Sequence, residues 1–344
     1  MKIAIHRRKN SFSEDWLPYC DALGIETQIV DSYSSNIVRQ LHDCDALMWH
    51  FHHASRRDVL FSKQLIYSLE TSGKVLFPDV NTCWFFDDKV AQKYLLEEIG
   101  APFVPAQIFY DKISACKWIE TASFPKVFKL RHGAGSSNVQ LARSKQEAFA
   151  LAGRAFGRGF QQYRAASSLR DRWMKYRLGL TGFNDVVKGI LRFGYTTDFN
   201  RVINRERGYV YFQDYIPDKT FDLRVIVIGD KAFGIKRNTR PNDFRASGSG
   251  LVEYGREHFS DAIIRQSFDL AKKIKSKALS IDYVCDQRPM IVEINFGFSS
   301  EVYRSCPGYW DRQLNWYDGP FNPSHWMVDG VIHEIEEHRF TPSK

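Results

Sequence analysis

The sequence predicts a protein of mixed α/β and α+β class, in which a doubly wound parallel sheet comes first and antiparallel parts follow. Residues 1–85 alternate short apolar strands with polar-faced helices, which is typical of a parallel sheet. Residues 221–237 and 280–296 each contain two apolar runs joined by a turn, which is typical of an antiparallel hairpin. We expect an N-terminal domain at 1–104, a small central domain at 105–210 and a C-terminal domain at 211–344.

The composition is that of a folded, soluble protein. The 344 residues are 44% hydrophobic and 15% aromatic, which is enough for a sizeable core and argues against disorder. Six scattered cysteines without a C-x-x-C pair predict a reduced, cytoplasmic protein without a cysteine-based zinc site. The N-terminus has no apolar stretch after its basic residues, and no run approaches the roughly 18 apolar residues of a membrane helix. We therefore expect no processing and no membrane insertion.

The positive charge of the chain is concentrated in one segment. Residues 150–208 contain twelve Lys and Arg against four Asp and Glu, a surplus of +8 that equals the formal net charge of the whole chain. Such a charge favours an anionic partner, such as a nucleotide, a phosphate, an acidic polymer or nucleic acid. An ordinary solubility charge explains the total equally well.

In the N-terminal part, the predicted strands are KIAI (2–5), TQIV (27–30), DALMWHF (45–51) and KVLF (74–77). Ligands of such sheets bind beyond the carboxyl ends of the strands. The candidate substrate contacts there are His6, Arg7, His50, His52 and His53. Hydrogen-bonded packing is the alternative for the histidines, and no carboxylate lies at the spacing of a metal ligand beside them.

Four further elements complete the prediction. A helix at 87–99 is expected to have Asp87 as its N-cap and one apolar face, formed by Val90, Tyr94, Leu95 and Ile99. Short strands (QIFY, KVFKL, NVQLA and YVYFQDYI) are expected in the central part. A helix at 261–275 precedes the second hairpin. The aromatic tail at 306–330 is broken by Pro and Gly, so we expect an irregular cover.

Three oxygen-bearing side chains fall on one patch of the second predicted hairpin. Glu293 and Asn295 share a face of the returning strand because strand side chains alternate, and Asp282 can meet them from the outgoing strand. Carboxylate and amide oxygens are hard ligands that suit a magnesium ion also bound to phosphates. Polar residues facing solvent are the alternative, but the flanking residues are apolar.

A glycine-rich loop follows a strand that ends at Lys129. The run His132-Gly-Ala-Gly-Ser-Ser137 offers backbone N–H groups that can approach an anion closely, since glycine removes the side chain.

Together with these features, four blocks of sequence between residues 86 and 300 resemble the ATP-grasp superfamily. They are DDKVAQKYLLEEIGAPFVP, FPKVFKLRHGAGSSNV, YFQDYIPDKTFDLRVIVIGDKAFGIKRNTRPNDFRASGSG and SIDYVCDQRPMIVEINFGFS. The resemblance is to the branch of the ribosomal-protein glutamate ligases (RimK-like), and more distantly to D-alanine–D-alanine ligase. It implies that the N-terminal sheet is a pre-ATP-grasp domain and that a two-part ATP-grasp fold follows.

The resemblance implies a role for each matching residue. Lys89 and Lys129 would contact the phosphates of ATP, and the hinge Gln213-Asp214-Tyr215-Ile216 would bind adenine through its backbone. Position 214 is Asp where the family more often has Glu, which favours backbone contacts over a role for this side chain. Asp222 would lie near the ribose. The phosphate loop would contribute Gly133, Gly135, Ser136 and Ser137.

By the same resemblance, three arginines would surround the transferred phosphoryl group, namely Arg224, Arg237 and Arg245. Gly248, Ser249 and Gly250 would form a second loop able to close on the nucleotide. Mg²⁺, with Mn²⁺ as an alternative, would be held by Asp282, Glu293 and Asn295.

The implied reaction is ATP-dependent ligation, in which a carboxylate becomes an acyl phosphate and an amine then displaces phosphate to form an amide. We hypothesise that the basic segment binds an acidic or sugar-linked second substrate, as in modification of a cell-surface polysaccharide; a solvated decoration or oligomer contact is the alternative. An ATP-grasp kinase without amide formation is a second hypothesis. A nucleic-acid-binding protein is a third, disfavoured because it leaves the carboxylate cluster unexplained. A homo-oligomer stays open.

Overall fold

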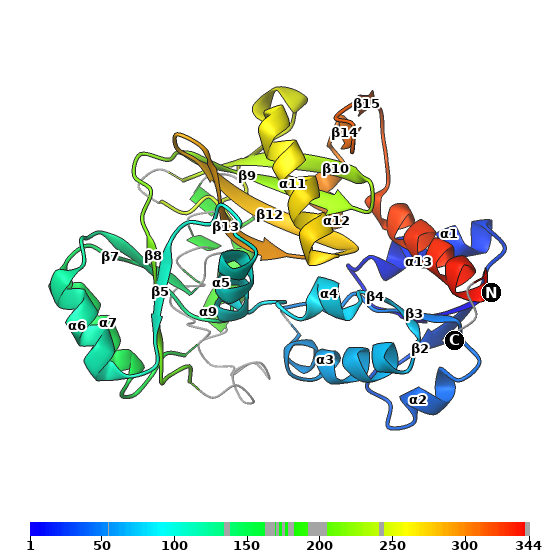
Figure 1. Ribbon diagram of the computed structural model, residues 1–344, viewed down its shortest axis with the longest axis horizontal. Helices are drawn as coiled ribbons and strands as arrows, with labels where there is room; N and C mark the ends of the chain where they lie inside the picture. The colour runs from blue at the N-terminus through cyan, green and yellow to red at the C-terminus, as the bar shows by residue number, and fades with distance from the viewer. Residues whose placement is uncertain are drawn as a thin grey trace.

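A computed structural model describes residues 1–53, 55–133, 138–161, 169, 172–173, 176–177, 182–191, 205–240 and 244–340 (Figure 1). In these ranges the chain forms three sheets, one parallel and two antiparallel. Gly135, Ser136 and Ser137 of the predicted phosphate loop, and most of the basic segment, lie outside the described residues.

The N-terminal sheet is parallel, with strand order β2-β1-β3-β4, as the alternating pattern predicts. Ile3 and Ile5 of β1 pack on the core shared with α1, while Ala4 between them packs on the opposite core beside Ile66 of α3. The sheet is therefore covered on both faces, as in a doubly wound fold. Its elements are β1 (Lys2–His6), α1 (Ser13–Ala22), β2 (Glu26–Val30), α2 (Ile37–Gln40), β3 (Ala46–Met48), α3 (Arg56–Thr71), β4 (Val75–Phe77) and α4 (Val80–Cys83).

The central part is a four-stranded antiparallel sheet with strand order β5-β8-β6-β7. Its strands match those predicted. Phe128 and Phe212 are buried on the face that α6 and α7 cover. The elements are β5 (Ala106–Phe109), α6 (Lys112–Thr121), β6 (Lys126–Lys129), β7 (Val139–Ala142), α7 (Lys145–Ala155), α9 (Phe183–Leu191) and β8 (Val210–Asp214).

The C-terminal part is built around a larger antiparallel sheet with strand order β13-β12-β9-β10-β14-β15. Both predicted hairpins are confirmed, and Gly229 takes φ +57° in the two-residue turn of the first. Helix α11 buries Ile264 and Phe268 on one face of this sheet. The elements are β9 (Phe221–Ile228), β10 (Lys231–Asn238), β11 (Val252–Glu253), α11 (Asp261–Ile274), β12 (Ala278–Cys285), β13 (Pro289–Asn295), α12 (Ser300–Tyr303), β14 (Gly308–Asp311), β15 (Trp316–Asp318) and α13 (Pro323–Phe340).

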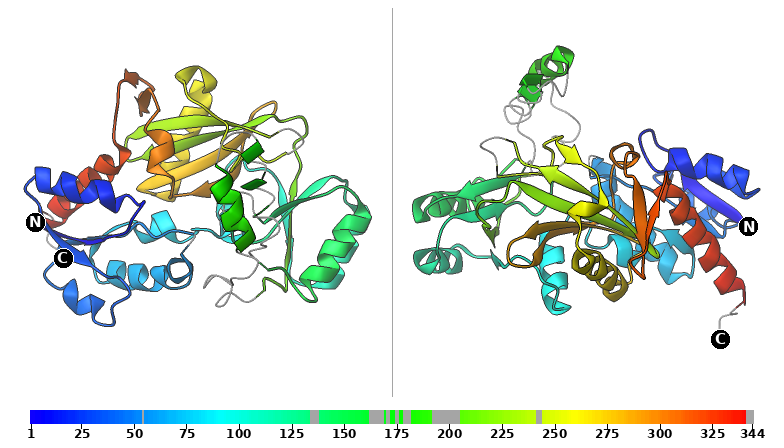
Figure 2. Two further views of the ribbon diagram at one scale, coloured as in Figure 1. Left: turned by 180° about the vertical axis from the view of Figure 1, so that it is seen from behind. Right: turned by 90° about the horizontal axis from the view of Figure 1, so that it is seen from above.

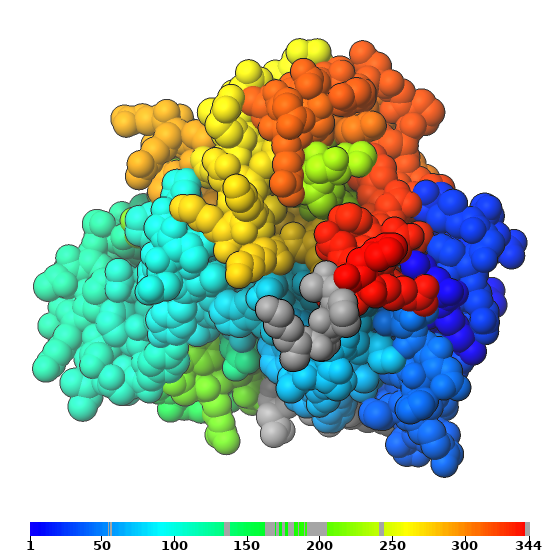
Figure 3. Space-filling model, turned by 45° about the vertical axis from the view of Figure 1, so that its right-hand side comes forward, coloured from blue at the N-terminus to red at the C-terminus, as the bar shows by residue number. Residues whose placement is uncertain are grey.

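The expectation of an irregular C-terminal cover is wrong. Strands β14 and β15 extend the C-terminal sheet, and α13 returns to pack against α1 and β4 of the N-terminal part. Figure 3 shows the atoms of α13, in red, against those of α1, in blue. Met327 and Val331 are buried there beside Trp16, so the tail closes a core that residues 1–104 alone leave open. Most of the Pro and Gly residues of the tail lie at or between the ends of these elements, while Gly330 lies inside α13.

The predicted start of the helix at 87–99 is also wrong by one residue. Helix α5 (Lys89–Glu98) has Asp88 as its N-cap, and the Asp88 carboxylate accepts the N–H groups of Val90 and Ala91 at 3.2 and 3.1 Å. Asp87 takes a positive φ of +51° and serves another loop. Tyr94, expected on the apolar face, is 47% exposed and its hydroxyl pairs with that of Tyr110.

The six cysteines, all within the described residues, are free thiols. Among the described helices, none combines the length and the apolar character needed to cross a bilayer.

Candidate functional site

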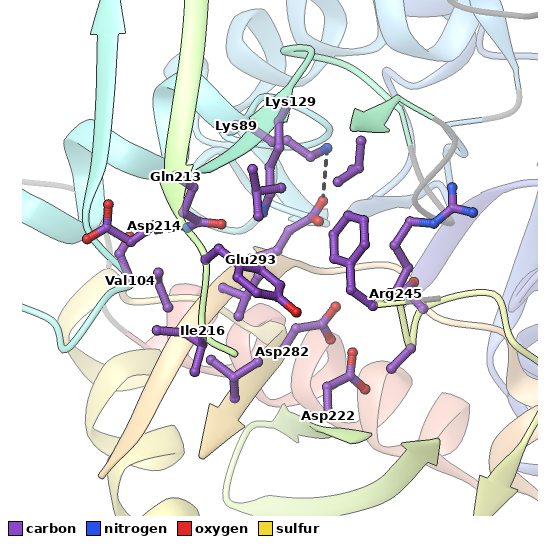
Figure 4. A pocket seen from close by; sticks show the side chains of 18 of the residues that line it. Lys89, Val104, Lys129, Gln213, Asp214, Ile216, Asp222, Arg245, Asp282 and Glu293 are labelled. Atoms are coloured by element: carbon purple, nitrogen blue, oxygen red, sulfur yellow. Dashed lines mark hydrogen bonds and ion pairs between the residues drawn. The ribbon is translucent and has the colours of Figure 1, made fainter. Parts of the chain in front are cut away.

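A cavity lies between the central and C-terminal sheets, and its empty volume, together with the adjoining space that is open to solvent, is about 780 Å³. The α5 N-terminus, β6 and β8 form one side, and β9, β12, β13 and the 244–247 segment form the other (Figure 4). It collects predicted site residues from all four sequence blocks. Those lining it are Lys89, Lys129, Gly133, Gln213, Asp214, Tyr215, Ile216, Asp222, Arg245, Asp282 and Glu293.

The two predicted phosphate-binding lysines are both buried beside the cavity. Lys89 Nζ donates to the carbonyl oxygen of Gly133 at 2.8 Å and lies 3.2 Å from Glu293 Oε1. Burial opposes the charge of Lys89, but the carboxylates of Glu293 and Asp87 outweigh it and raise the pKa of Lys89. For Lys129 burial prevails, and its pKa falls to about 8 although Glu293 attracts the charge. Lys129 is therefore a buried ammonium with little compensation, which suits a polyanionic ligand.

The start of the glycine-rich loop is fixed by the residue expected as a helix cap. Asp87 accepts the N–H of Gly133 at 2.8 Å, and Asn138 Nδ2 donates to the carbonyl of His132 at 2.9 Å. Gly133 has φ +120°, and a Cβ atom there would lie 2.4 Å from Asn138 Nδ2. Only glycine fits this position.

Glu206, which the sequence analysis did not single out, anchors the same loop. Its carboxylate accepts the N–H groups of Arg131 and His132 at 3.1 and 3.3 Å and contacts the His132 ring at 3.0 Å. It also accepts the Tyr209 hydroxyl. The one weak sequence signal is that Glu206 is the single acid in an otherwise basic run of residues, Arg205 to Arg207.

At the predicted adenine hinge, the side chain of residue 214 points away from the cavity. Lys126 Nζ donates to Asp214 Oδ1 at 2.6 Å, and Figure 4 shows the Asp214 carboxylate turned away from Glu293 and Asp282. Gln213 is buried and donates to the carbonyl of Val104 at 3.2 Å. The Asp214 N–H already donates to the Pro105 carbonyl at 2.9 Å, so the rest of the backbone of residues 214–216 is the part of the hinge suited to bind a ligand.

Two predicted catalytic arginines form a buried ion-pair cluster with two predicted binding carboxylates. Arg224 donates to both oxygens of Asp282, at 2.5 and 2.7 Å, and Arg237 donates to both oxygens of Asp222, at 2.6 Å each. Arg237 also lies 3.0 Å from Asp282 Oδ2. Asp222 and Asp282 line the cavity, whereas Arg224 and Arg237, which bind them, are not among its lining residues.

The cluster separates the pKa values of its two carboxylates. Burial disfavours ionisation of Asp282, but Arg224 and Arg237 outweigh it and hold the pKa of Asp282 below its usual value. Burial raises the pKa of Asp222 in spite of its bond to Arg237. Asp282 is the more firmly ionised member and thus the better ligand for a cation.

The three predicted metal ligands lie on neighbouring residues of β12 and β13. Asp282 and Glu293 are directly paired across the two strands, and both line the cavity. Asn295 Oδ1 accepts the N–H of Phe296 at 2.9 Å, and Asn295 is not among the lining residues. Within the described ranges, no three His, Cys, Asp or Glu side chains gather at metal spacing. Two paired carboxylates with an amide oxygen two residues on still fit a hard divalent cation.

The third predicted arginine lines the cavity, and the second glycine loop directly follows the same segment of chain. Arg245 lines it from the 244–247 segment. Arg240, buried and not predicted, donates to the carbonyl oxygens of Gly248 and Ser249. Arg240 therefore fixes the loop whose closing role the sequence suggested.

The candidate substrate contacts at the N-terminal sheet are partly packing residues. His6 Nδ1 accepts the N–H of Ser32 at 3.0 Å, and His50 Nδ1 accepts the N–H of Phe12 at 3.1 Å. Burial lowers the pKa of both rings. Arg7 is exposed, while its neighbour Arg8 contacts buried Asp58.

His53 links this edge to the cavity. Burial lowers the pKa of His53 to about 3, and the positive charges of Lys89 and Arg224 contribute to this shift. The histidine loop therefore lies near Lys89 and Arg224.

Tyr303 of α12 is a further polar residue that no motif indicated. Its hydroxyl is buried and has no hydrogen-bond partner among the described residues. Burial raises the pKa of Tyr303 to about 12, while the charges of Arg224 and Arg237 act against the rise. An orphan hydroxyl beside this cluster is a candidate donor to a bound ligand.

No family model matches the chain, and no curated protein matches it in sequence. Solved structures do match in fold. A RimK-domain ATP-grasp protein from Sphaerobacter thermophilus DSM 20745 is 14% identical and covers 96% of this chain and 100% of its own, with a TM-score of 0.55. D-alanine–D-alanine ligase from Bacillus anthracis, complexed with ATP, is 14% identical over 99% of both chains, with a TM-score of 0.56.

A third match is N5-carboxyaminoimidazole ribonucleotide synthetase from Thermotoga maritima, which is 13% identical and covers 96% of this chain and 75% of its own, with a TM-score of 0.58. These similarities extend over nearly the whole chain. They confirm the fold that the four sequence blocks implied. The chain has the ATP-grasp fold, which it shares with a RimK-domain protein among others.

Proposed function

We propose that the protein is an ATP-dependent carboxylate–amine ligase that forms an amide through an acyl phosphate and releases ADP and phosphate. The observation that carries the proposal is the cavity, in which two buried lysines, a hinge and the two carboxylates that the arginine cluster holds face one space. This combination suits a nucleoside triphosphate at one end of the cavity and a carboxylic acid substrate at the other.

In this proposal the adenine lies against the backbone of residues 214–216. The triphosphate extends towards Lys89 and Lys129, and the loop that begins at Gly133 covers it. Lys129 supports this placement because its ammonium is buried and Glu293 compensates its charge only in part, and the phosphates would supply the missing charge.

Arg224 and Arg237 would stabilise the charge that develops during phosphoryl transfer to the substrate carboxylate. Their bonds to Asp282 and Asp222 hold both guanidinium planes before substrate arrives, so little reorganisation is needed at the transition state. The loop held by Arg240 would exclude water that otherwise hydrolyses the acyl phosphate. The amine then displaces phosphate from the acyl carbon.

Asp282 and Glu293, with Asn295 beside them, would hold a divalent cation, Mg²⁺ or Mn²⁺. Such an ion neutralises phosphate charge and polarises the phosphoryl group when bound.

The identity of the acid and the amine is a finer proposal. The basic segment at 150–208 favours an acidic or sugar-linked substrate, such as a polysaccharide precursor. Its described helix α9 stands away from the sheets in the right-hand view of Figure 2 and exposes Phe183 and Ile190. Replacing Arg172 and Arg177 by Ala is expected to raise the KM of that substrate only.

The decisive experiment is a thermal-shift titration with Mg-ATP, metal-free ATP and Mg-GTP for native protein, Glu293→Ala and the control Glu301→Ala, whose carboxylate is exposed on α12. We expect Mg-ATP to stabilise the native and control proteins and the effect to weaken in Glu293→Ala. Acid and amine pairs are then screened for ADP release. Free phosphate that appears only with an amine identifies a ligase, whereas phosphate retained on the product identifies a kinase. No response to any nucleotide contradicts the proposal.

A further inference from the structure

A second cluster of polar residues, separate from those lining the nucleotide cavity, lies at the carboxyl edge of the N-terminal sheet. At its centre is Asp58, which is only 2% exposed. Its carboxylate accepts hydrogen bonds from Arg8 Nη1 at 2.8 Å, from the His52 N–H at 2.6 Å and from Ser55 Oγ at 2.6 Å, as well as from the Tyr33 hydroxyl. These donors come from the segments after β1, β2 and β3, so one carboxylate joins three loops at the sheet edge.

Asp58 holds Arg8 firmly in place. The backbone of Arg8 is fixed as well, because its N–H donates to Ser13 Oγ and its carbonyl accepts Ser11 Oγ and Ser13 Oγ. A guanidinium has five N–H donors, and Asp58 takes one of them. The Arg8 side chain is 33% exposed, so the remaining donors are accessible to a ligand.

Histidine rings extend from Arg8 towards the reacting end of the nucleotide cavity. The ring centroids of His50 and His52 are 6.1 Å apart, and those of His52 and His53 are 4.0 Å apart. His50 Nε2 is fully buried, has no hydrogen-bond partner among the described residues, and faces Gly297, two residues after Asn295. Burial and the charge of Arg8 lower the pKa of His52, which favours the neutral form of this ring.

The arrangement is suited to an anion other than the triphosphate. Arg8, His52 and His53 are not among the residues that line the nucleotide cavity. Four donors share the lone pairs of Asp58, and Arg8 supplies one of these donors. The outer face of the Arg8 guanidinium can therefore bind an external carboxylate in the forked geometry that a guanidinium favours. His50 Nε2 supplies a second, unsatisfied polar group at the same edge.

We propose that Arg8, positioned by Asp58, binds a carboxylate that takes no part in the reaction. One co-substrate would therefore carry a spare carboxylate: a dicarboxylic acid, whose other carboxylate is phosphorylated, or an amino acid that supplies the amine. This inference rests on the proposed ligase function and narrows its substrates to one of these two sources.

The test is equilibrium binding to the full-length protein, followed by thermal shift, with and without Mg²⁺ and a non-hydrolysable ATP analogue. The probes are succinate, glutarate, L-aspartate and L-glutamate, each compared with its neutral amide. The variants are Arg8→Gln, Arg8→Lys and the control Lys9→Gln, which removes a positive charge from the exposed neighbouring residue. Arg8→Lys keeps a cation opposite Asp58, so it preserves the fold if Arg8→Gln does not.

We expect at least one acid, but not its amide, to stabilise the native and Lys9→Gln proteins. Both Arg8 variants should weaken that binding about tenfold or more. Stabilisation by glutarate or succinate identifies the acid substrate as the source, and stabilisation by the amino acids alone identifies the amine substrate. The inference is overturned if no acid stabilises native protein, or if binding is unchanged in Arg8→Lys. Nucleotide binding is scored separately, so a failure of the ligase proposal is distinguishable from a failure of this one.

Discussion

Arg224 and Asp282 face each other on neighbouring strands, and the Arg224 guanidinium donates to both oxygens of the Asp282 carboxylate. Both side chains are largely buried: 9% of the Asp282 side chain and 24% of the Arg224 side chain are exposed. The pair therefore joins the proposed metal site to the proposed phosphoryl-transfer site.

Asp282→Asn is expected to destabilise the protein by about 3 kcal/mol, because it leaves two buried guanidinium groups without their shared charge. Urea unfolding measures this. Asp286→Asn, at an exposed ion pair with Lys219, is the control and should cost less than about 1 kcal/mol. The pKa of Asp282 is lowered in the folded protein, so its ionised carboxylate stabilises the fold above a pH of about 3.9, the ordinary aspartate pKa. This stabilisation is lost as the pH falls towards the pKa of the folded state. Equal losses in the two variants would contradict the cluster.

Lys129 should take up a proton when ATP binds. Its pKa is about 8 in the free protein, so near pH 8 roughly half the molecules carry the charge, and the phosphates should restore it in the rest. Calorimetry of ATP binding at pH 8 in buffers of different ionisation enthalpy should show uptake of about half a proton. Lys129→Met should lose both the uptake and the activity; uptake that persists in this variant would refute the assignment.

The same shift makes a prediction for stability. The unfolded chain holds the Lys129 proton up to about pH 10.4, whereas the folded protein releases it near pH 8. The unfolded state thus binds more protons between these values, and the free energy of unfolding should gain a positive contribution as the pH rises through this window. Lys129→Met should remove that contribution, as measured by urea unfolding at pH 7 and pH 9.5.

Gly133→Ala should weaken ATP binding at least about tenfold, because the added Cβ meets Asn138 and the backbone conformation is strained. Gly73→Ala has a similar positive φ but nothing within 4 Å of the new Cβ, so it tests strain alone. It should cost roughly 1 kcal/mol of stability and leave ATP binding unchanged. Calorimetry distinguishes the two, and identical behaviour would show that the loop does not contact ATP.

Tyr303→Phe should leave the free protein as stable as the native one, or more stable by about 1 kcal/mol, because the buried hydroxyl has no partner among the described residues. If that hydroxyl donates to a bound substrate, kcat/KM should fall while stability does not. Thermal unfolding and steady-state kinetics measured together separate these effects.

Asp214→Asn should change the KM for ATP by less than about threefold, since the carboxylate pairs with Lys126 outside the cavity. A larger loss would mean that the side chain reaches the nucleotide when the protein closes.

Much of the site followed from local sequence. A two-residue turn at Gly229 fixes the register of the first hairpin, which places Asp222 opposite Arg237, and the second hairpin pairs Asp282 with Glu293 in the same way. Alternation along each strand then determines which side chains share a face.

The sequence by itself determined the parallel and antiparallel sheets and both hairpins, because each depends on short-range periodicity and turn chemistry. The resemblance of the four sequence blocks, rather than periodicity, indicated Lys89, Lys129 and the hinge, which line the cavity, but it also indicated Arg224 and Arg237, which are not among the lining residues. Only the tertiary structure decided three other features. Strand β9 pairs with β12, which brings Arg224 to Asp282. Helix α13 closes the N-terminal core, and Asp58 joins Arg8 to the histidine loop. The Arg8–Asp58 contact spans 50 positions and the Arg224–Asp282 contact spans 58, and no local pattern encodes them. They form because burying apolar surface and pairing buried charges across the assembled sheets lowers the free energy of the whole fold.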